Sequence, residues 1–259
     1  MRAEPVYECL IEIADVPVRI RCRHQVNIDF FRDYRTEKPE RYVIEPAEED
    51  LTRMRAELGW KNDVKGLPRA ESFLENNTIH LLLAERLVQE NVLLMHGSAL
   101  CMDGQAYIFT ARSGTGKSTH TRLWREAFGD RVWMINDDKP MLRIEDSGVR
   151  VYGTPWNGKH RLSRNASAPL RAVVNLERDT FNHVEPLPKA DAFQVLMKQV
   201  FGFRDPASAA RVMELEIRLL GMTDFLLLGC NTEPDAAKTV WEEMNRLLPA
   251  RAESPAERK

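Results

Sequence analysis

The stretch Ala111-Arg-Ser-Gly-Thr-Gly-Lys-Ser-Thr119 decides how this 259-residue chain is interpreted, because its pattern is typical of a loop that holds the phosphates of a nucleotide. Backbone N–H groups of such a glycine-rich loop point at the anion, while Lys117 reaches the outer phosphates and the Ser118 hydroxyl joins a Mg²⁺ shell. Ala111 stands where the usual pattern has its first glycine. We therefore predict that this loop binds ATP or a close relative through Arg112, Ser113, Gly114, Thr115, Gly116, Lys117, Ser118 and Thr119.

The residues on either side of the loop predict a strand before it and a helix after it. The apolar run 106–110 is typical of a buried strand, and apolar residues then recur at helical spacing from Leu123 to Phe128, where Gly129 ends the helix. The start of such a helix adds unpaired N–H groups and partial positive charge to an anion site. A glycine-rich turn without a ligand is the alternative, and the order of strand, loop and helix argues against it.

Composition places the chain among globular proteins. Hydrophobic residues make up 43% of it, which is enough for one large domain or two modest ones. Lys plus Arg (37) nearly balance Asp plus Glu (39), so no global field favours nucleic acid or an anionic membrane as a partner. The scattered cysteines lack zinc spacing and are expected to be buried free thiols. The first residues alternate apolar with charged side chains, unlike a signal peptide, and no long apolar run predicts a membrane span, so we expect a cytoplasmic protein.

Apolar patterns elsewhere predict further strands and helices. Residues 6–13 and 16–22 alternate like two strands of a hairpin that turns at Ala14-Asp15. The segment 30–70 has little clear period and is interpreted either as a small cap domain or as a substrate-specific insert. A helix is expected from Thr78, capped by Asn77 or Thr78. We expect later strands at 132–135, 141–144, 149–152 and 171–176, and helices at 189–201, 207–220 and 234–248.

A two-residue turn at Asp103-Gly104 predicts that the run 92–100 pairs antiparallel with the strand before the glycine-rich loop. This pairing places His96 near the same sheet as the loop. The chain is accordingly divided into a small N-terminal β-rich or α+β region, a domain that contains the glycine-rich loop, and a frayed tail, at residues 1–75, 76–250 and 251–259.

Asp137 and Asp138 follow the apolar strand 132–135 and are candidates for catalysis. Phosphoryl transfer needs one carboxylate beside the attacking hydroxyl and another at the metal, and an acidic strand end places Asp near the Mg²⁺ that Ser118 holds. Adjacent strand residues point to opposite faces, so the pair serves both roles only if the backbone turns here, as Pro140 favours. An acidic turn is the alternative; the phosphate loop before it favours the functional interpretation.

Other polar residues have two open interpretations. His96 either orients a phosphate or tunes an aspartate, or it is a satisfied core side chain. The stretch 153–164 combines turn formers with cations, of which Lys159 and Arg161 lie just behind a glycine. Such a loop either closes over phosphates and supplies charge in the transition state, or is a solvated basic loop.

The order of these motifs resembles the catalytic core of the HPr kinase/phosphorylase family. His96-Gly97 comes first, Ser113-Gly-Thr-Gly-Lys-Ser118 follows, and Asp137-Asp138 comes last. The family is related in fold to ATP-dependent phosphoenolpyruvate carboxykinase. The resemblance, over roughly residues 78–200, implies an α/β P-loop core with a mixed β-sheet flanked by helices. It also implies ATP and Mg²⁺ as cofactors, Asp137 as general base, Asp138 at the metal and phosphate site, and His96 near the active centre.

Two departures from that family bear on the acceptor. Residues 152–164 lack the family's glycine-rich glutamate motif, and the first 75 residues do not suggest its N-terminal domain. We therefore expect a shorter HPr kinase-like protein whose acceptor is not HPr. A serine or threonine of a peptide or protein and a small hydroxylated metabolite both stay open, as does assembly into a homo-oligomer.

Functions of other classes are the main alternatives. A GTPase switch should carry an Asn/Thr-Lys-x-Asp motif and a transporter ATPase a Leu-Ser-Gly-Gly signature, and the sequence has neither. A nucleotide-binding ATPase, or a regulatory module without a phosphoryl acceptor, remains open. The intact Lys117, Ser118 and aspartate pair argue against a degenerate module.

Overall fold

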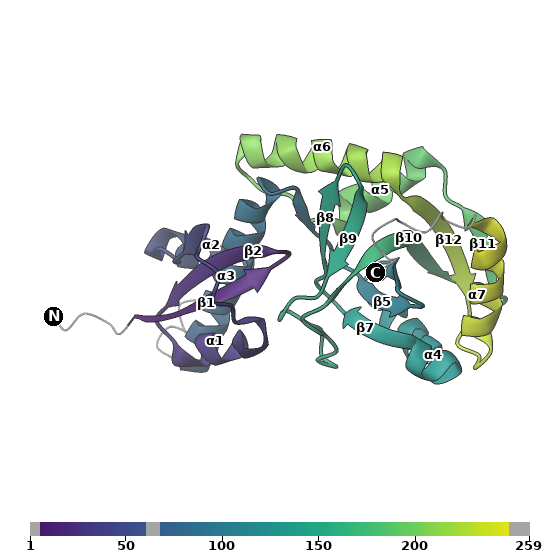
Figure 1. The fold of residues 1–259 in the computed structure, drawn as a ribbon, viewed down its shortest axis with the longest axis horizontal. Helices are drawn as coiled ribbons and strands as arrows, with labels where there is room; N and C mark the ends of the chain where they lie inside the picture. Colours follow the sequence, from purple (N-terminus) through teal and green to yellow (C-terminus); the bar gives the residue numbers. More distant parts are fainter. Residues whose placement is uncertain (1–5, 61–67, 249–259) are drawn as a thin grey trace.

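The computed structural model describes residues 6–60 and 68–248 of the chain. They form a mixed α/β protein in which a small N-terminal sheet lies beside a larger curled sheet flanked by helices (Figure 1). Among the described residues, no helix has the length and apolar character that crossing a membrane requires. The described cysteines are buried free thiols, as expected. The proposed tail, 251–259, lies outside the described residues.

The N-terminal part begins with the predicted hairpin. Strands β1 (Tyr7–Ile13) and β2 (Val16–Cys22) pair antiparallel, and Ala14 and Asp15 turn between them with φ values of 49° and 61°. Consecutive positive φ values match the right-handed twist of paired strands, which is why short hairpins use such turns. A third strand, β3 (Tyr42–Ile44), runs parallel to β2 and completes the small sheet.

Helices lie within and on either side of the segment 30–70, for which no clear period was found. They are α1 (Gln25–Phe30), the 3-10 helix η1 (Arg32–Tyr34), α2 (Glu48–Glu57) and α3 (Pro68–Val88). The helix predicted to start at Thr78 was placed wrongly, since α3 begins ten positions earlier, at Pro68. Asn77 and Thr78 lie inside it and donate side-chain hydrogen bonds to the carbonyls of Phe73 and Leu74, at 2.8 and 2.9 Å. Side chains of this type favour N-caps, but inside a helix they can instead bond back to a carbonyl of the preceding turn.

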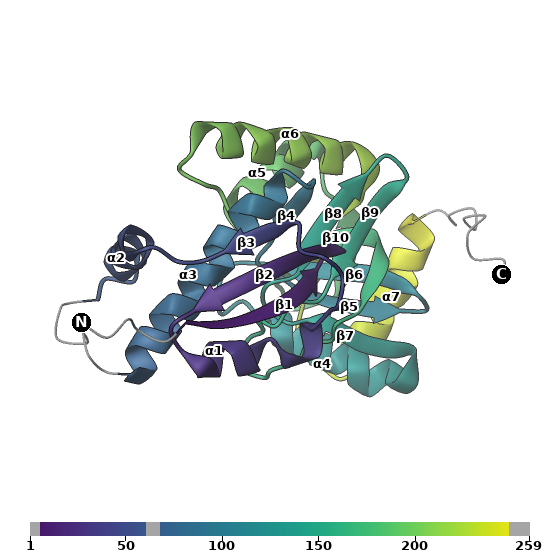
Figure 2. The same cartoon turned by 60° about the vertical axis from the view of Figure 1, so that its left-hand side comes forward.

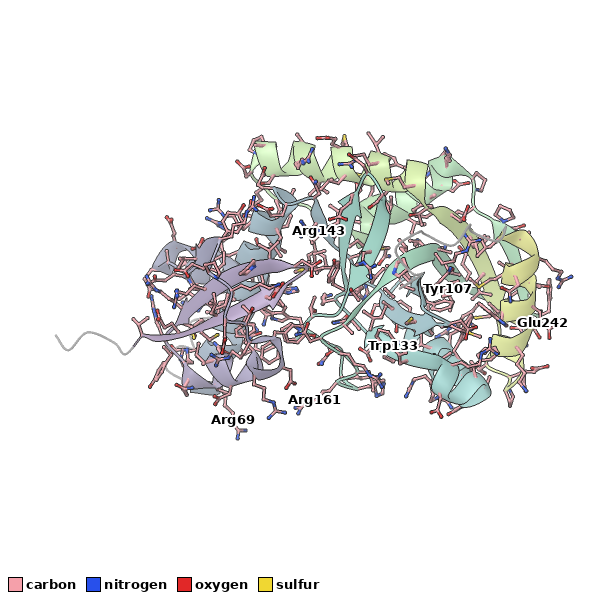
Figure 3. The ribbon with its side chains drawn as sticks, in the orientation of Figure 1. Arg69, Tyr107, Trp133, Arg143, Arg161 and Glu242 are labelled. Carbon is pink, nitrogen blue, oxygen red and sulfur yellow. The ribbon has the colours of Figure 1, made fainter. Side chains whose placement is uncertain are left out.

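Helix α3 joins the small sheet to the large one. Its apolar side chains, including Leu83 and Leu87, pack in one cluster with Ile11 of the hairpin and Val92 of the large sheet. The predicted boundary between residues 75 and 76 falls within this helix, and the division into domains stays a prediction. Figure 2 shows α3 running behind β1 and β2. Arg143 adds a polar link, because its guanidinium donates to the Ala14 carbonyl at 2.6 Å, and Figure 3 labels it between the two parts.

The large sheet contains strands from the rest of the chain. They are β4 (Val92–Leu94), β5 (Ser98–Met102), β6 (Gln105–Thr110), β7 (Val132–Asn136), β8 (Met141–Glu145), β9 (Gly148–Tyr152), β10 (Ser167–Arg178), β11 (His183–Pro186) and β12 (Asp224–Cys230). The main path runs β4-β8-β9-β10-β6-β5-β7, with β12 on β10 and β11 on β12. The predicted antiparallel pairing of the run 92–100 with β6 is confirmed only for β5, because Val92–Leu94 forms the separate strand β4, which pairs with β8. Strands β8 and β9 pair antiparallel as well. Strand β10 is parallel to both β6 and β12, so the sheet is mixed.

Helices cover both faces of this sheet. They are α4 (Lys117–Phe128), followed by the 3-10 helix η3 (Gly129–Arg131), α5 (Lys189–Gln199), α6 (Pro206–Met222) and α7 (Ala236–Leu247). On β6, Ile108 packs in the cluster beneath α5 and α6, whereas Phe109 packs in the cluster beneath α4 and α7. Neighbouring strand residues face opposite sides, so the two helix pairs lie on opposite faces (Figure 1).

Candidate functional site

The glycine-rich loop connects β6 to α4, in the order that the sequence predicts. Gly114 and Gly116 have φ values of 79° and 131°, which residues with a Cβ adopt only with strain. Ala111 is buried and is not among the described residues with a positive φ, so its methyl group causes no such strain. Lys117 opens α4, and its ammonium donates to the Ala111 carbonyl at 3.0 Å. The alanine in place of the first glycine is therefore compatible with a closed loop.

Strand β10 supports the loop from its parallel neighbour position. Arg178, at the end of β10, donates to the carbonyls of Gly114 and Thr115 at 2.6 and 3.0 Å. These bonds fix the Gly114 and Thr115 carbonyls on the side of Arg178. This favours a loop whose N–H groups point away from that side. Arg178 was not predicted, because its strand was expected to end at 176.

A cavity of about 850 Å³ lies alongside the loop. The loop residues 112–115 form one wall. Strand β10 and helix α5 add the cations Arg178 and Lys198 and also the acidic residues Glu177 and Asp191. This volume is within the range of about 300–1,000 Å³ that small-molecule sites occupy. Because anions are attracted to backbone N–H groups at a helix start, the combination of loop, cations and volume fits a polyphosphate ligand.

The acidic residues lie on a turn that Asn136 builds. Its side-chain oxygen accepts N–H bonds from Asp138 and Lys139 at 2.8 and 2.7 Å, while its amide donates to the Thr154 and Trp156 carbonyls at 3.0 and 3.2 Å. Asn136 is fully buried, so all of these bonds are shielded from water. The backbone therefore bends directly after β7. Such a bend is required if Asp137 and Asp138 are to serve two different roles, one beside the attacking hydroxyl and one at the metal.

Asp137 is buried, and one of its two carboxylate oxygens accepts a hydrogen bond from the protein. Its Oδ1 accepts the Gly158 N–H at 2.9 Å, and its Oδ2 has no hydrogen-bond partner within the described part of the chain. Burial raises the pKa of Asp137 above its ordinary value, and the nearby Asp138 charge raises it further, against the lowering effect of the Gly158 bond. Gly158 is needed here because a Cβ at that position would lie 2.5 Å from Asp137 Oδ1.

Asp138 is more exposed than Asp137 and lies beside a histidine and a lysine. Its Oδ1 lies 3.5 Å from His96 Nε2 and 3.5 Å from the Lys139 ammonium. Burial, followed by the charges of Lys117 and Lys139, lowers the pKa of His96. Burial also lowers the pKa of Lys117, and Asp138 opposes that effect. The Asp138 charge therefore acts on the pKa of Lys117, which links the acidic turn electrostatically to the glycine-rich loop.

The dipeptide His96-Gly97 bridges the loop and the acidic turn. Thr110, the residue before the loop, donates its hydroxyl hydrogen bond to the His96 carbonyl at 3.0 Å. The Gly97 N–H donates to the Asp138 carbonyl at 3.1 Å. The structure therefore brings the predicted His96, the loop and the acidic pair to one end of the sheet. The His96 ring also contacts Gln199 of α5, with Nδ1 3.1 Å from Oε1.

Lys159 and Arg161 lie on the loop between β9 and β10. Both are exposed, and within the described residues no hydrogen bond or ion pair links either side chain to the glycine-rich loop. Figure 3 labels Arg161 at the lower edge of the molecule. Their role over bound phosphates stays a prediction, while the backbone of this same loop supplies the Gly158 contact.

Comparisons with known proteins give little further information. No known protein family and no curated protein matches the sequence. Among solved structures, the Hpr(Ser) kinase/phosphatase from Coxiella burnetii is similar to the chain with a TM-score of 0.33 and 12% identity, over 60% of this chain and 96% of that protein. A similarity at this level carries no argument about activity, so the functional assignment rests on the chain's own residues.

Proposed function

We propose that this protein is a kinase that uses ATP and Mg²⁺ to phosphorylate a hydroxyl group, on a serine or threonine of a polypeptide or on a small hydroxylated metabolite. One observation carries the proposal: Thr110, directly before the glycine-rich loop, and Asp138 of the acidic pair both hydrogen-bond to His96-Gly97, at 3.0 and 3.1 Å. A phosphate-binding loop and a carboxylate pair at one end of a sheet are the parts that phosphoryl transfer needs.

Binding of the nucleotide is assigned to the loop and its cavity. The N–H groups at the start of α4 attract the phosphates, and Lys117 neutralises the outer ones. The cavity of about 850 Å³ offers room for the remainder of the nucleotide beside β10 and α5. Arg178 keeps the loop carbonyls turned away from the anion.

Transfer is assigned to Asp137. The acceptor oxygen attacks the γ-phosphorus, the bond from that phosphorus to the β–γ bridging oxygen breaks, and ADP leaves with the electron pair. The hydroxyl proton passes to Asp137, whose Oδ2 has no partner in the described chain and whose pKa is raised by burial. A carboxylate with a raised pKa is a better base than an ordinary one.

The residues present fit a magnesium ion that arrives with the nucleotide. The described residues contain no group of three or more His, Cys, Asp or Glu side chains arranged for a metal. Mg²⁺ commonly binds through one or two protein oxygens together with phosphates and waters, and Ser118 and Asp138 are oxygen donors of that kind. When bound, the ion neutralises charge on the phosphates.

The proposal is tested by following labelled γ-phosphate from ATP in the presence of Mg²⁺ and hydroxyl-bearing acceptors. Asp137→Asn should abolish transfer and leave ATP binding largely in place, whereas Lys117→Ala should weaken both. Asp130→Asn, at an exposed position, is the matched control. Phosphate that appears only in water would favour the ATPase alternative, and wild-type transfer by Asp137→Asn would refute the base assignment.

A further inference from the structure

A second cavity, of about 480 Å³, lies between the N-terminal helices and the acidic turn. Helices α1 and α3 of the N-terminal part form one side of it, and the acidic turn and the loop before β10 form the other. Asp138 and Asn157 both line it, and Asn157 precedes the glycine that holds Asp137. The cavity therefore lies next to the acidic turn, at Asp138 rather than at Asp137 itself, and shares none of its described lining residues with the cavity beside the glycine-rich loop.

The rim of this cavity is apolar and exposed. Val26, Phe30 and Phe73 have exposed fractions of 59%, 39% and 52%, and all three line the cavity. Large apolar side chains that gather in one exposed place mark sites where a partner covers them. A sugar or polyol would leave these side chains in water, whereas an apolar side chain next to the accepting hydroxyl would cover them.

The floor of the cavity is aromatic and uncharged. His80 stacks on Trp156 with ring centroids 4.3 Å apart and an interplanar angle of 17°. Burial lowers the pKa of His80 to about 3, and the Lys139 charge acts in the same direction, so the ring is neutral near pH 7. His80 is only 5% exposed, and its Nε2 has no hydrogen-bond partner in the described chain. The floor therefore offers aromatic ring surface without charge.

The walls of the cavity carry amide groups. Asn77 donates to a backbone carbonyl of its own helix at 2.8 Å, and Asn157 donates to Ser163 Oγ at 2.7 Å. Each uses its N–H₂ in this way, which leaves the amide oxygen to accept a bond from a ligand. Asp138 and Lys139 are the charged residues among those described as lining the cavity, and both belong to the acidic turn. Neutral amide oxygens suit the N–H groups of an extended polypeptide.

We propose that this cavity binds the phosphoryl acceptor, and that the acceptor is a serine or threonine in a polypeptide segment with a large apolar side chain next to it. The inference rests on the proposed kinase function and specifies its substrate class. The hydroxyl enters beside Asp138 and Asn157, while the neighbouring apolar side chain covers Phe30 and Phe73. A charged side chain next to the accepting hydroxyl would meet no opposite charge among the described residues of the cavity other than Asp138 or Lys139 of the acidic turn.

The test measures phosphate transfer from labelled ATP to serine peptides whose flanking residues are Phe or Leu, Gly, Asp or Lys. Peptides with an apolar flank should have a kcat/KM higher by about tenfold or more than the others, the scale of discrimination expected for a filled hydrophobic pocket. Phe30→Ser and Phe73→Ser should each raise KM for the apolar peptide and reduce this preference, with the KM for ATP unchanged. Ile217→Ser, which removes an apolar side chain of α6 that is 59% exposed, should alter neither KM.

A binding measurement without turnover separates the two proposals. The Phe-flanked peptide with Ala in place of Ser should shift the ¹⁹F NMR signal of fluorotryptophan at Trp156, and Phe30→Ser should weaken that binding. The γ-phosphate of ATP could instead be transferred to polyols, or to peptides with charged flanking residues, as readily as to peptides with apolar flanking residues. In that case the kinase proposal stands and the acceptor inference is refuted. If phosphate passes only to water, the kinase proposal fails, and with it the acceptor role of the cavity, even if the peptide binds.

Discussion

Replacing Gly158 with alanine should disable the proposed base without touching the nucleotide loop. The new Cβ would lie 2.5 Å from Asp137 Oδ1, and the other carboxylate atoms would lie 3.3 and 3.4 Å from it. Ordinary van der Waals contact begins at 3.4 Å, so Asp137 and the 157–159 backbone must move apart. A misplacement of about 1 Å at a reacting group can lower the rate about 10²-fold. The expected result is a kcat lower by about two orders of magnitude, with an almost unchanged KM for ATP.

The same substitution should also change stability. Moving Gly158 weakens its N–H bond to Asp137, and loss of a bond to a buried polar group costs about 1–3 kcal/mol. Urea unfolding measures this free energy, and radiolabelled transfer measures kcat. Gly202→Ala is the control, because a Cβ at Gly202 would meet no atom within 4 Å. Wild-type kcat for Gly158→Ala would show that the Asp137 position does not matter for transfer, and the assignment of the base would then be wrong.

Three further predictions concern the acidic turn and the loop. Burial raises the folded-state pKa of Asp137, so stability should fall as pH rises from its unfolded pKa, about 3.9, through its folded pKa. Asp137→Asn should remove that fall in melts recorded across this pH range; an unchanged pH profile would contradict the assigned burial effect. Asn136→Ala should destabilise the fold by about 2–4 kcal/mol in urea, because several buried bonds are lost together, and a change below about 0.5 kcal/mol would refute the role of this side chain in the turn. Arg178→Ala should weaken ATP-analogue binding measured by calorimetry, and unaltered affinity would show that the loop keeps its shape without the β10 contact.

Local patterns predicted the parts of the fold that depend on neighbouring residues. The strand before the glycine-rich loop, the helix after it and the helices α5, α6 and α7 all have apolar residues at regular spacing, and the structure contains each of them. The turn at Asp103-Gly104 correctly predicted how β5 and β6 pair. Short-range rules suffice in these places because the deciding contacts lie within a few residues.

Elements that long-range packing defines could not be predicted from local patterns. Strand β12 was not predicted, although Asp224–Cys230 is an apolar run, and its parallel pairing with β10 depends on residues far away in the chain. Strand β10 was predicted too short for the same reason, since β9, β6 and β12 pair with different parts of it. The start of α3 was misplaced because the side chains of Asn77 and Thr78 look like caps and act as helix-interior donors.

Motifs predicted the candidate site residues, but not the partners that position them. Nothing in the sequence indicates that Gly158 holds Asp137, or that Gln199 contacts His96 from a helix 103 positions later. Asn136 precedes the acidic pair directly, and its preference for turns was the one available signal. The assigned roles of Lys159 and Arg161 remain predictions, since their side chains are exposed.

A crystal structure with Mg²⁺ and a non-hydrolysable ATP analogue tests the central claim most directly. We predict that the phosphates lie against the backbone N–H groups of residues 113–118 and the Lys117 ammonium, with the terminal phosphorus within direct or one-water reach of the Asp137 and Asp138 carboxylates. An analogue bound elsewhere, or carboxylates more than about 10 Å from that phosphorus, beyond the reach of proton transfer through one water, would contradict the account.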